Sequence, residues 1–586
     1  QREVYFQVLE NKQVLKKLLS SSICKKLLDL GYFSLLKVEK NRLKLPSFID
    51  EKAPKLTLEQ TNAINAIYYG DQTSYLLEGV TGSGKTEVYL KLAEKTLQEG
   101  KNVLFLVPEI ALTPMMIGHF IKRFDAKVAL FHSELTNGEK YDEYRRIASG
   151  DVRIVVGARS AIFAPLTNIG LIVVDEEHSA TYKQETSPFY HALAVAEMRA
   201  KTYNAKIVFG SATPSLETRA RALKGIYGHV FLHDRINKKA LPHTKIIDML
   251  DYRNVSKRSV YFSKVLLEAL TETLEKKEQA ILLVNRRGYA SYVSCRNCRY
   301  VARCPECGIT LTYHQAEKNL LCHHCGHEED MITECPECHS PHLSISGFGT
   351  ERAVEQVQKL FPTAKILRLD SDITKKHTNM TKILGKFSRH EADILIGTQM
   401  IAKGHDFPNV TLVGVINADS GLAIPSFRAS ETTFQLIMQA IGRSGRAEKV
   451  GRAIIQTTLK EHYAITSASQ QNYQSFYQTE MHYRRLAKMP PFTYLLQISL
   501  SSRDEDRVEE TTITLKNNLE EVLGADAVII GPSIPLFQVI KNQHERNLIV
   551  KYSNYFRIKP KLLKVLHPIM ENSQFRVKIN IEPYDI

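Results

Sequence analysis

At about 150 residues per domain, the 586 residues predict about four domains, and the 43% hydrophobic and 24% charged side chains exclude a disordered or fibrous chain. No apolar run approaches the roughly 18 residues that span a bilayer and no signal pattern opens the chain, so we expect a folded cytoplasmic protein. The 78 basic and 63 acidic side chains leave a charge of +15, which favours a polyanion such as nucleic acid, although excess lysine can also serve solubility alone.

The first residues predict part of a winged helix. Ser20, Ser21 and Ser22 are suited to cap a short helix that ends at Gly31, and a β-rich run over residues 33–38 follows. A helix followed by such a strand is typical of the end of a winged-helix domain.

A phosphate-binding loop is predicted at residues 79–86. Apolar residues 76–77 lead into a G-x-x-x-x-G-K-[ST] motif, and a helical pattern follows over residues 87–96. The backbone of such a loop wraps phosphate oxygens, its lysine reaches the β and γ phosphates, and its threonine hydroxyl binds Mg²⁺. We therefore expect ATP to be bound by Gly79, Thr81, Gly82, Ser83, Gly84, Lys85 and Thr86.

Gln60 lies shortly before this loop and is placed to read the adenine base. The alternative is an ordinary glutamine on the surface.

An acidic motif follows the apolar run at residues 171–174. Asp175 would hold Mg²⁺ through water, and Glu176 would polarise the attacking water. The alternative is an acidic helix start favoured by the helix dipole, which suits Glu177 but not the whole run.

Two sets of β-rich runs alternate with helical patterns, so we expect an α/β fold with two tandem RecA-like lobes. The phosphate loop and the acidic motif belong to the first set, and their ATP cleft would lie between the lobes. The first set comprises residues 103–107, 154–156, 171–174 and 207–209, and the second comprises residues 281–284, 366–369, 394–396 and 412–416.

Eight of the nine cysteines form four C-x-x-C pairs within the second set, just after its first strand. Two such pairs supply a closed four-sulfur shell, so we expect two structural Zn²⁺ ions in a projecting insertion; disulfides are the alternative. Spacing does not decide which pairs share an ion, but we favour nesting. One ion would then be held by Cys304, Cys307, Cys322 and Cys325, and the other by Cys295, Cys298, Cys335 and Cys338.

Four histidines lie near these pairs, but four thiolates already complete each shell. We therefore interpret His323, His324, His327 and His339 as neighbours of the metal sites rather than ligands.

Arg443 and Arg446 are three residues apart, so on a helix both could face the first lobe. Arginines so placed neutralise charge on a transferred phosphoryl group, and we expect both to be catalytic. Ordinary helix-surface arginines are the alternative. After about residue 470, a β-rich run over residues 495–500 begins a separate α+β domain.

Together these motifs resemble the primosomal protein N′ (PriA) family, the superfamily 2 DNA helicases of bacterial replication restart. The cysteine insertion within the second lobe is the most specific part of the resemblance, which covers nearly the whole chain. The implied domains are 1–50 (winged-helix-like), 51–232 (lobe 1), 233–294 and 346–470 (lobe 2), 295–345 (two-zinc insertion) and 471–586 (C-terminal α+β domain).

The resemblance implies ATP-driven 3′-to-5′ DNA unwinding at stalled or abandoned replication forks and loading of the replicative helicase. The implied partners are forked and single-stranded DNA, single-stranded DNA-binding protein, other primosome proteins and the helicase loader, with the chain a monomer. On this resemblance, we expect the family's N-terminal DNA-binding domain to be absent from this sequence.

Residues 182–191 resemble the family's aromatic-rich loop, which couples DNA contact to hydrolysis. Tyr182, Phe189 and Tyr190 offer rings for base stacking beside Lys183, although Phe189 stands where the family has arginine. A loop anchored by buried aromatic rings is the alternative.

Two other functions stay open. The chain could be a zinc-stabilised DNA-binding scaffold whose ATP cycle does little unwinding. It could also be an RNA helicase, because the lobe motifs do not distinguish the two sugars.

Overall fold

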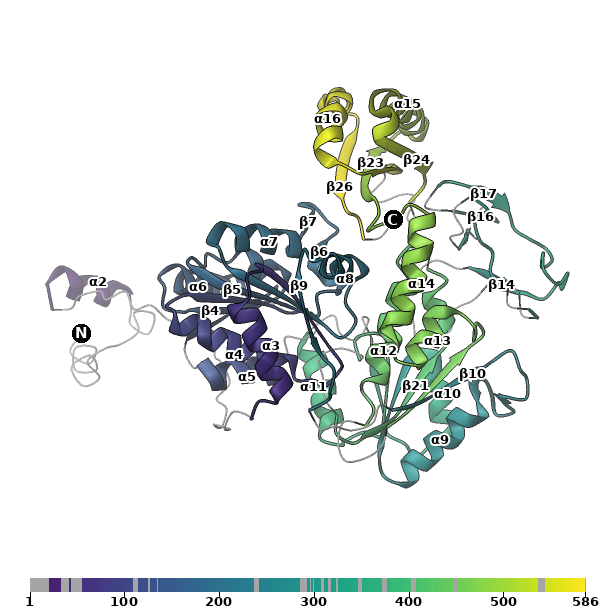
Figure 1. Ribbon diagram of the computed structural model, residues 1–586, viewed down its shortest axis with the longest axis horizontal. Helices are drawn as coiled ribbons and strands as arrows, with labels where there is room; N and C mark the ends of the chain where they lie inside the picture. Colours follow the sequence, from purple (N-terminus) through teal and green to yellow (C-terminus); the bar gives the residue numbers. More distant parts are fainter. Residues whose placement is uncertain are drawn as a thin grey trace.

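The computed structural model describes residues 21–32, 42–43, 55–108, 114–124, 127–133, 135–236, 242–284, 292–295, 297–298, 300–306, 310–314, 318–322, 325–345, 350–370, 377–401, 407–424, 426–445, 451–535 and 543–584. Two α/β lobes lie side by side, with the C-terminal domain and the cysteine-rich insertion beside the second lobe (Figure 1). In this part of the chain, no helix combines the length and apolar character needed to cross a membrane.

Lobe 1 is built on a parallel sheet with the strand order β3-β4-β2-β5-β8-β1-β9. Its strands are β1 (Ser74–Gly79), β2 (Asn102–Leu106), β3 (Val128–Phe131), β4 (Ile154–Gly157), β5 (Ile169–Asp175), β8 (Lys206–Ser211) and β9 (Gly228–Leu232). Its helices are α3 (Leu58–Tyr69), α4 (Lys85–Gln98), α5 (Pro114–Phe124), α6 (Asn137–Ala148), α7 (Ala192–Tyr203) and α8 (Leu216–Leu223).

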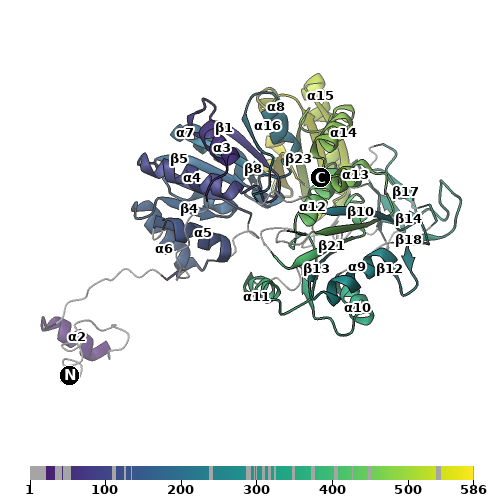
Figure 2. The same cartoon turned by 60° about the horizontal axis from the view of Figure 1, so that its bottom comes forward.

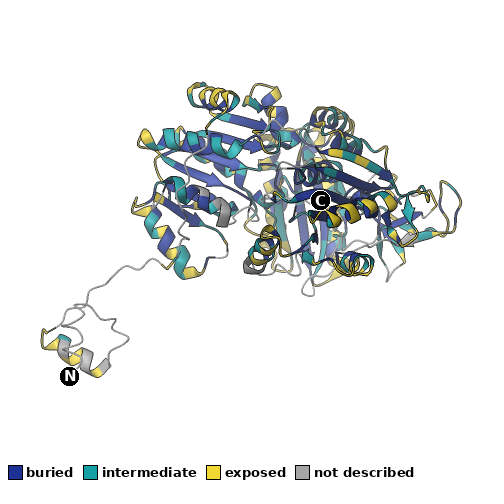
Figure 3. Ribbon diagram, turned by 90° about the horizontal axis from the view of Figure 1, so that it is seen from below, coloured by how far each residue is buried: buried dark blue, intermediate teal, exposed yellow. Residues whose placement is uncertain are grey.

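Both faces of this sheet are buried, because successive side chains of a strand point to opposite faces. On β1, Leu77 packs into one core and Leu76 into the other. Figure 3 shows the strands of both lobes as mostly buried beneath their helices.

Lobe 2 repeats the design with the strand order β10-β22-β21-β13-β20-β19, again parallel. Its strands are β10 (His243–Asp248), β13 (Gln279–Val284), β19 (Ile366–Leu369), β20 (Ile394–Gly397), β21 (Val410–Ile416) and β22 (Arg452–Thr457). Its helices are α9 (Lys264–Glu275), α10 (Thr350–Leu360), α11 (His377–Ser388), α12 (Ala429–Ile441), α13 (Tyr463–Ser469) and α14 (Tyr473–Leu486), and a hairpin joins β11 (Val255–Ser256) to β12 (Ser259–Ser263) (Figure 2).

The predicted fold class of two parallel-sheet lobes is confirmed, and all eight predicted runs lie on strands of the two sheets. The prediction missed several strands, among them β3, β9 and β10, which lie at sheet edges. An edge strand can bury less of its surface, as the partly exposed β9 and β10 show, whereas β3 is apolar and buried. The cysteine-rich insertion follows the predicted run at residues 281–284, as expected, but this run is β13, the second strand of the sheet in chain order, because β10 precedes it.

The cysteine-rich insertion leaves the lobe after β13 and returns before α10. Its short strands are β14 (Val293–Cys295), β15 (Thr312–His314), β16 (Asn319–Leu321), β17 (Glu328–Asp330) and β18 (Leu343–Ile345), of which β14 pairs with β18 and β15–β17 form a meander. Its small core includes Cys304 and Cys322, so its few apolar residues need further stabilisation.

The C-terminal domain is an antiparallel sheet with two helices, as expected for an α+β unit. Its strand order is β24-β25-β23-β26. The elements are β23 (Tyr494–Ser502), α15 (Glu505–Leu523), β24 (Ala527–Ser533), β25 (His544–Tyr552), α16 (Tyr555–Glu571) and β26 (Arg576–Ile581). Helix α14, which the predicted limits assign to this domain, instead packs Tyr473 and Phe476 into the lobe 2 core.

At the N-terminus, helix α2 (Ser21–Asp29) forms before Gly31, in agreement with the predicted helix. The predicted strand at residues 33–38 lies outside the described residues.

Candidate active site

The phosphate loop joins the end of β1 to the start of α4. Gly82 and Gly84 have positive φ angles of 85° and 79°, which glycine adopts without strain. Lys85 donates from Nζ to the Gly79 carbonyl at 2.8 Å, so the ammonium group lies across the loop. Within the described residues, the buried Ser83 Oγ has no hydrogen-bond partner. A loop with these features fits the phosphates of a nucleotide.

Gln60 is 3% exposed and lies against the loop rather than on the surface, so the surface alternative is wrong. Its Oε1 accepts from the Thr57 N–H at 2.9 Å in a capping box, and its Nε2 donates to the Ser83 carbonyl at 3.0 Å. A Cβ at Gly84 would lie 2.3 Å from this Nε2, so only glycine fits there. Gln60 thus holds the loop in place, and its contact with adenine stays a prediction.

Asp175 ends β5 opposite the phosphate loop. The Tyr89 hydroxyl donates to its Oδ1 at 3.1 Å. Burial and the neighbouring Glu176 carboxylate raise the pKa of Asp175 to about 7, whereas Lys85 and Tyr89 act in the opposite direction. Glu176 has a left-handed φ of 48°, which turns the chain sharply after the strand. Two adjacent carboxylates beside a phosphate loop are a donor set that fits Mg²⁺.

Glu177 does not start a helix of its own. Its carboxylate accepts from Ser215 N at 2.6 Å, from Ser215 Oγ at 3.0 Å and from Thr218 Oγ1 at 2.8 Å, at the start of α8. Burial nevertheless raises the pKa of Glu177 to about 7. The Glu177 carboxylate therefore lies at a helix N-terminus, where the helix dipole favours a negative charge. The helix is α8, however, and not one that starts at Glu177.

Lobe 2 reaches the phosphate loop directly. A Cβ at Gly442 would lie 2.9 Å from Thr81 Cγ2, so the backbone after α12 touches the loop. The expected helical placement is wrong for Arg443, because α12 ends at Ile441 and Arg443 lies in the turn that follows. Gly442 is the C-cap residue, and Gly445, with a φ of 69°, turns the chain away from the helix direction. Arg443 is 9% exposed beside the loop, and Arg446 lies outside the described residues.

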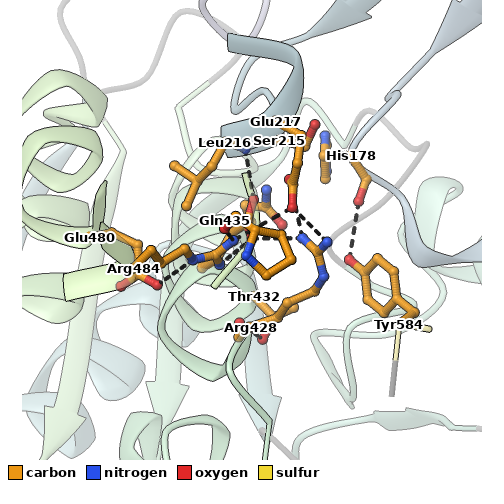
Figure 4. A network of polar contacts seen from close by, with 12 residues as sticks. His178, Ser215, Leu216, Glu217, Arg428, Thr432, Gln435, Glu480, Arg484 and Tyr584 are labelled. Atoms are coloured by element: carbon orange, nitrogen blue, oxygen red, sulfur yellow. Dashed lines mark hydrogen bonds and ion pairs between the residues drawn. The ribbon is translucent and has the colours of Figure 1, made fainter. Parts of the chain in front are cut away.

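Further contacts join the acidic motif of lobe 1 to α12. His178 lies with its Nδ1 2.7 Å from Ser211 Oγ and its Nε2 2.7 Å from Gln439 Nε2. Gln435 donates from Nε2 to the Thr213 carbonyl at 3.3 Å. Tyr584, from the C-terminal domain, lines the same cavity as His178, Gln435 and Gln439 (Figure 4).

An ion-pair network crosses the boundary between the lobes. Arg428 at the start of α12 pairs with Glu217 of α8 at 2.6 Å and with Glu431 at 3.2 Å. Arg484 of α14 then pairs with Glu431 at 2.7 Å and with Glu480 at 2.9 Å. Figure 4 shows these groups between the two ribbons. Such a network fixes the position of lobe 2 relative to α8.

The aromatic-rich loop lies after the acidic motif, but the expectation that Tyr182 offers its ring to bases is wrong. Its ring is 0% exposed, and its hydroxyl donates to the Asp175 carbonyl at 2.7 Å. Lys183 is 3% exposed. Buried anchoring, the alternative for this loop, explains both residues, since each finds a partner inside the protein.

Phe189 and Tyr190 are half-buried. The Tyr190 ring lies 5.0 Å from that of Phe163, which is 58% exposed. These rings form an aromatic pair on the surface that the sequence did not indicate, because Phe163 lies outside the predicted loop.

The cysteines group as the nested pairing predicts. The Sγ atoms of Cys295, Cys298, Cys335 and Cys338 lie within 4.8 Å of one another, as do those of Cys304, Cys322 and Cys325. Across the pairs, the sulfurs of Cys298 and Cys335 are 3.3 Å apart, and those of Cys304 and Cys325 are 3.4 Å apart. Tetrahedral zinc with bonds of about 2.3 Å places its sulfurs roughly 3.8 Å apart, so both groups fit the ion. Cys307, His323 and His324 lie outside the described residues.

The fold and the site define a class of protein: a helicase with two RecA-like lobes and a nucleotide cleft between them. Four family models match in the expected order. They are DEAD/DEAH box helicase (residues 57–222), PriA DNA helicase Cys-rich region (CRR) domain (304–329), Helicase conserved C-terminal domain (329–448) and Primosomal protein N C-terminal domain (485–584).

Curated relatives narrow the class to one family. The replication restart protein PriA of Bacillus subtilis (strain 168) is 46% identical over 513 residues, which cover 87% of this chain and 64% of the relative. PriA of Synechocystis sp. is 39% identical over 97% of this chain and 69% of its own length, and PriA of Chlamydia muridarum is 38% identical over 98% and 78%. The chain belongs to the replication restart protein PriA family. It spans about two thirds of the first two relatives.

Among solved structures, RecG bound to a three-way DNA junction is 15% identical with a TM-score of 0.42 over 79% of this chain and 47% of that chain. This likeness adds nothing to the family assignment.

Proposed function

We propose that the chain is an ATP-dependent 3′-to-5′ DNA helicase that recognises and remodels stalled or abandoned replication forks and starts primosome assembly by loading the replicative helicase. The observation that carries the proposal is the contact between Gly442 of lobe 2 and Thr81 of the phosphate loop. The turn of lobe 2 that carries Arg443 would lie beside a nucleotide bound by this loop. Hydrolysis of the nucleotide can therefore change the position of one lobe relative to the other.

Each candidate residue has a role in this cleft. Lys85 would compensate phosphate charge once it leaves the Gly79 carbonyl. Asp175 would bind Mg²⁺, which supplies charge compensation on the β and γ oxygens when bound, and Glu176 would orient water. Arg443, with Arg446 beyond it, would stabilise negative charge developing at the γ phosphate.

The family assignment supports DNA as the polymer, and the charge of +15 agrees with it. Two Zn²⁺ ions would complete the insertion, whose core is too small to fold on apolar burial alone. Single-stranded DNA-binding protein, other primosome proteins and the helicase loader are the partners we propose, with the chain acting as a monomer in the cytoplasm.

The test is ATP hydrolysis by this chain alone, with single-stranded DNA, with forked DNA and with RNA, together with strand separation on duplexes that carry a 3′ or a 5′ tail. We expect DNA to stimulate hydrolysis and only the substrate with a 3′ tail on the translocating strand to be unwound. Stimulation by RNA but not by DNA would contradict the choice of polymer.

A DNA-binding scaffold is the second candidate function. The burial of Tyr182 and Lys183 favours it, because these two side chains cannot contact DNA while they are buried and so cannot couple DNA contact to hydrolysis. DNA-stimulated hydrolysis without strand separation in the same assay would support the scaffold over the motor.

A further inference from the structure

Residues at the end of the C-terminal domain form hydrogen bonds with the aromatic-rich loop of lobe 1, which lies almost 400 residues earlier in the chain. Asn580 donates from Nδ2 to Glu185 Oε2 at 2.6 Å, and the Tyr584 N–H donates to Glu185 Oε1 at 2.9 Å. Both oxygens of one loop carboxylate are therefore held, one by Asn580 near the end of β26 and one by Tyr584 after it. We call Asn580, Ile581 and Tyr584 the C-terminal clamp.

The clamp also supplies a hydrogen-bond acceptor for the ammonium group of Lys183. This group donates to the Ile581 carbonyl at 2.6 Å. Burial lowers the pKa of Lys183, and the nearby carboxylates of Glu185 and Glu582 oppose this shift. A cation that sequence analysis assigns to DNA contact is thus buried against the protein's own oxygen atoms.

Both the aromatic-rich loop and the clamp contact the acidic motif of the nucleotide site. Tyr182, next to Lys183, donates its hydroxyl to the carbonyl of Asp175 at 2.7 Å. The Tyr584 hydroxyl lies 3.5 Å from the carbonyl of His178, at the other end of the acidic motif. The Tyr584 ring also lies 4.9 Å from the Arg428 guanidinium, which pairs with Glu217. A movement of the clamp would therefore change the contacts at Asp175. It would also change the contact between Tyr584 and Arg428 at the lobe boundary (Figure 4).

We propose that the C-terminal clamp positions the aromatic-rich loop in a state in which Lys183 is buried, and that a DNA phosphate releases the loop by replacing the Ile581 carbonyl as the partner of Lys183. This inference rests on the proposed function. A phosphate carries full charge and bonds an ammonium group more strongly than a neutral carbonyl does, so DNA is able to win the exchange. Clamp residues act through the loop and are positioning residues.

The test removes the clamp without touching the nucleotide site. Glu185→Ala, Asn580→Ala and the double variant are compared with wild type for ATP hydrolysis at zero and saturating single-stranded DNA, and for the DNA concentration that gives half-maximal stimulation. We expect each single variant to raise DNA-free hydrolysis about fivefold and to lower the half-maximal concentration, with the saturated rate within about twofold of wild type. The double variant should match Glu185→Ala, because that substitution already removes the contact with Asn580.

Lys183→Met supplies the opposite readout. This variant lacks the ammonium group that would bind a DNA phosphate, so its half-maximal DNA concentration should rise, whereas that of Glu185→Ala should fall. Lys183→Arg keeps the positive charge and should restore the half-maximal DNA concentration of the wild type. Glu545→Ala is the matched control, since Glu545 pairs with Lys578 inside the C-terminal domain at 2.6 Å. It should leave all three kinetic values unchanged.

A purely structural clamp would lower thermal stability and the saturated rate without raising DNA-free hydrolysis, which would overturn the proposal. If DNA stimulates hydrolysis by the wild type and the clamp variants behave identically to it, the proposed role of the clamp is wrong while the proposed function stands. If DNA does not stimulate ATP hydrolysis by the wild type, both the proposed function and the proposed role of the clamp are wrong.

Discussion

Arg428 of lobe 2 forms a two-pronged contact with Glu217 of lobe 1. Its Nη2 donates to Oε1 at 2.6 Å and its Nη1 to Oε2 at 3.2 Å, and the two side chains are 12% and 24% exposed. Burial raises the pKa of Glu217, but the charges of Arg428 and Arg484 outweigh burial and lower the pKa to about 2. This pair is the centre of the network that holds α8 against α12.

We expect Glu217→Gln to destabilise the lobe boundary. The substitution removes one of the two charge partners of a buried arginine. Loss of the partner costs about 3 to 5 kcal/mol for a fully buried pair, and partial exposure together with the remaining partner Glu431 reduces this to about 2 kcal/mol. Thermal unfolding should shift to lower temperature. Asp251→Asn, in an exposed pair with Arg253 within lobe 2, is the control and should cause no measurable shift. Equal shifts in both variants would contradict the importance of the boundary.

Lys85→Ala should reduce ATP hydrolysis at least 100-fold, because the phosphate loop loses its cation. DNA binding should be largely unchanged, since Lys85 bonds the Gly79 carbonyl inside the cleft. Radiolabelled phosphate release and fluorescence anisotropy with single-stranded DNA measure the two separately.

Lys91→Ala is the matched control on the same helix, because Lys91 pairs with Glu94 at 2.7 Å away from the loop. It should hydrolyse ATP as wild type does. A parallel loss of hydrolysis and DNA binding in Lys85→Ala would sink the assignment of Lys85 to the nucleotide alone.

The parts of the fold that the sequence revealed are those in which local pattern and chemistry coincide. The strand end at Gly79, the glycines of the loop and the start of α4 follow one another without a gap, so the loop could be recognised directly. The C-x-x-C pairs are equally local, and the two confirmed parallel sheets come from runs buried on both faces. The assigned catalytic roles stay predictions.

What the sequence could not reveal depends on long-range contacts. Tyr182 reads as an exposed stacking ring until its hydroxyl is found on the Asp175 carbonyl. The partners of Glu185 lie almost 400 residues away, beyond any local pattern. The end of α12 could not be placed either, because glycine is tolerated within helices and only the approach of Gly442 to Thr81 requires it here.

Paired cysteine variants test the nested zinc sites. Wild type should hold about two Zn²⁺ per chain. Cys298→Ser with Cys335→Ser should remove one ion, because both residues belong to the same group. Cys298→Ser with Cys304→Ser should remove both ions, because the residues belong to different groups. Elemental analysis of freshly reduced protein measures the content, and the reverse result would indicate that consecutive pairs share each ion.

Glu582 provides a pH dependence that can be tested by stability. Its Oε1 accepts from the Leu495 N–H at 3.2 Å, and burial raises its pKa from 4.5 to about 7. Between these values the folded chain binds a proton that the unfolded chain has released. Stability from this group is therefore greatest below about pH 4.5 and falls as the pH rises to about 7.

Glu582→Gln keeps the hydrogen-bond acceptor and removes the titration. We expect the variant to melt at a higher temperature than wild type at pH 8, by an amount worth at most about 3 kcal/mol, and at a similar temperature near pH 5. Melting curves of both proteins across pH 5–8 measure the difference, in which other titrating groups cancel. A difference that stays constant over this range would show that Glu582 ionises in the folded protein as it does in the unfolded chain. A lower melting temperature for the variant at pH 8 would show that its carboxylate is stabilised by Lys183 and Arg428, whose charges act against burial.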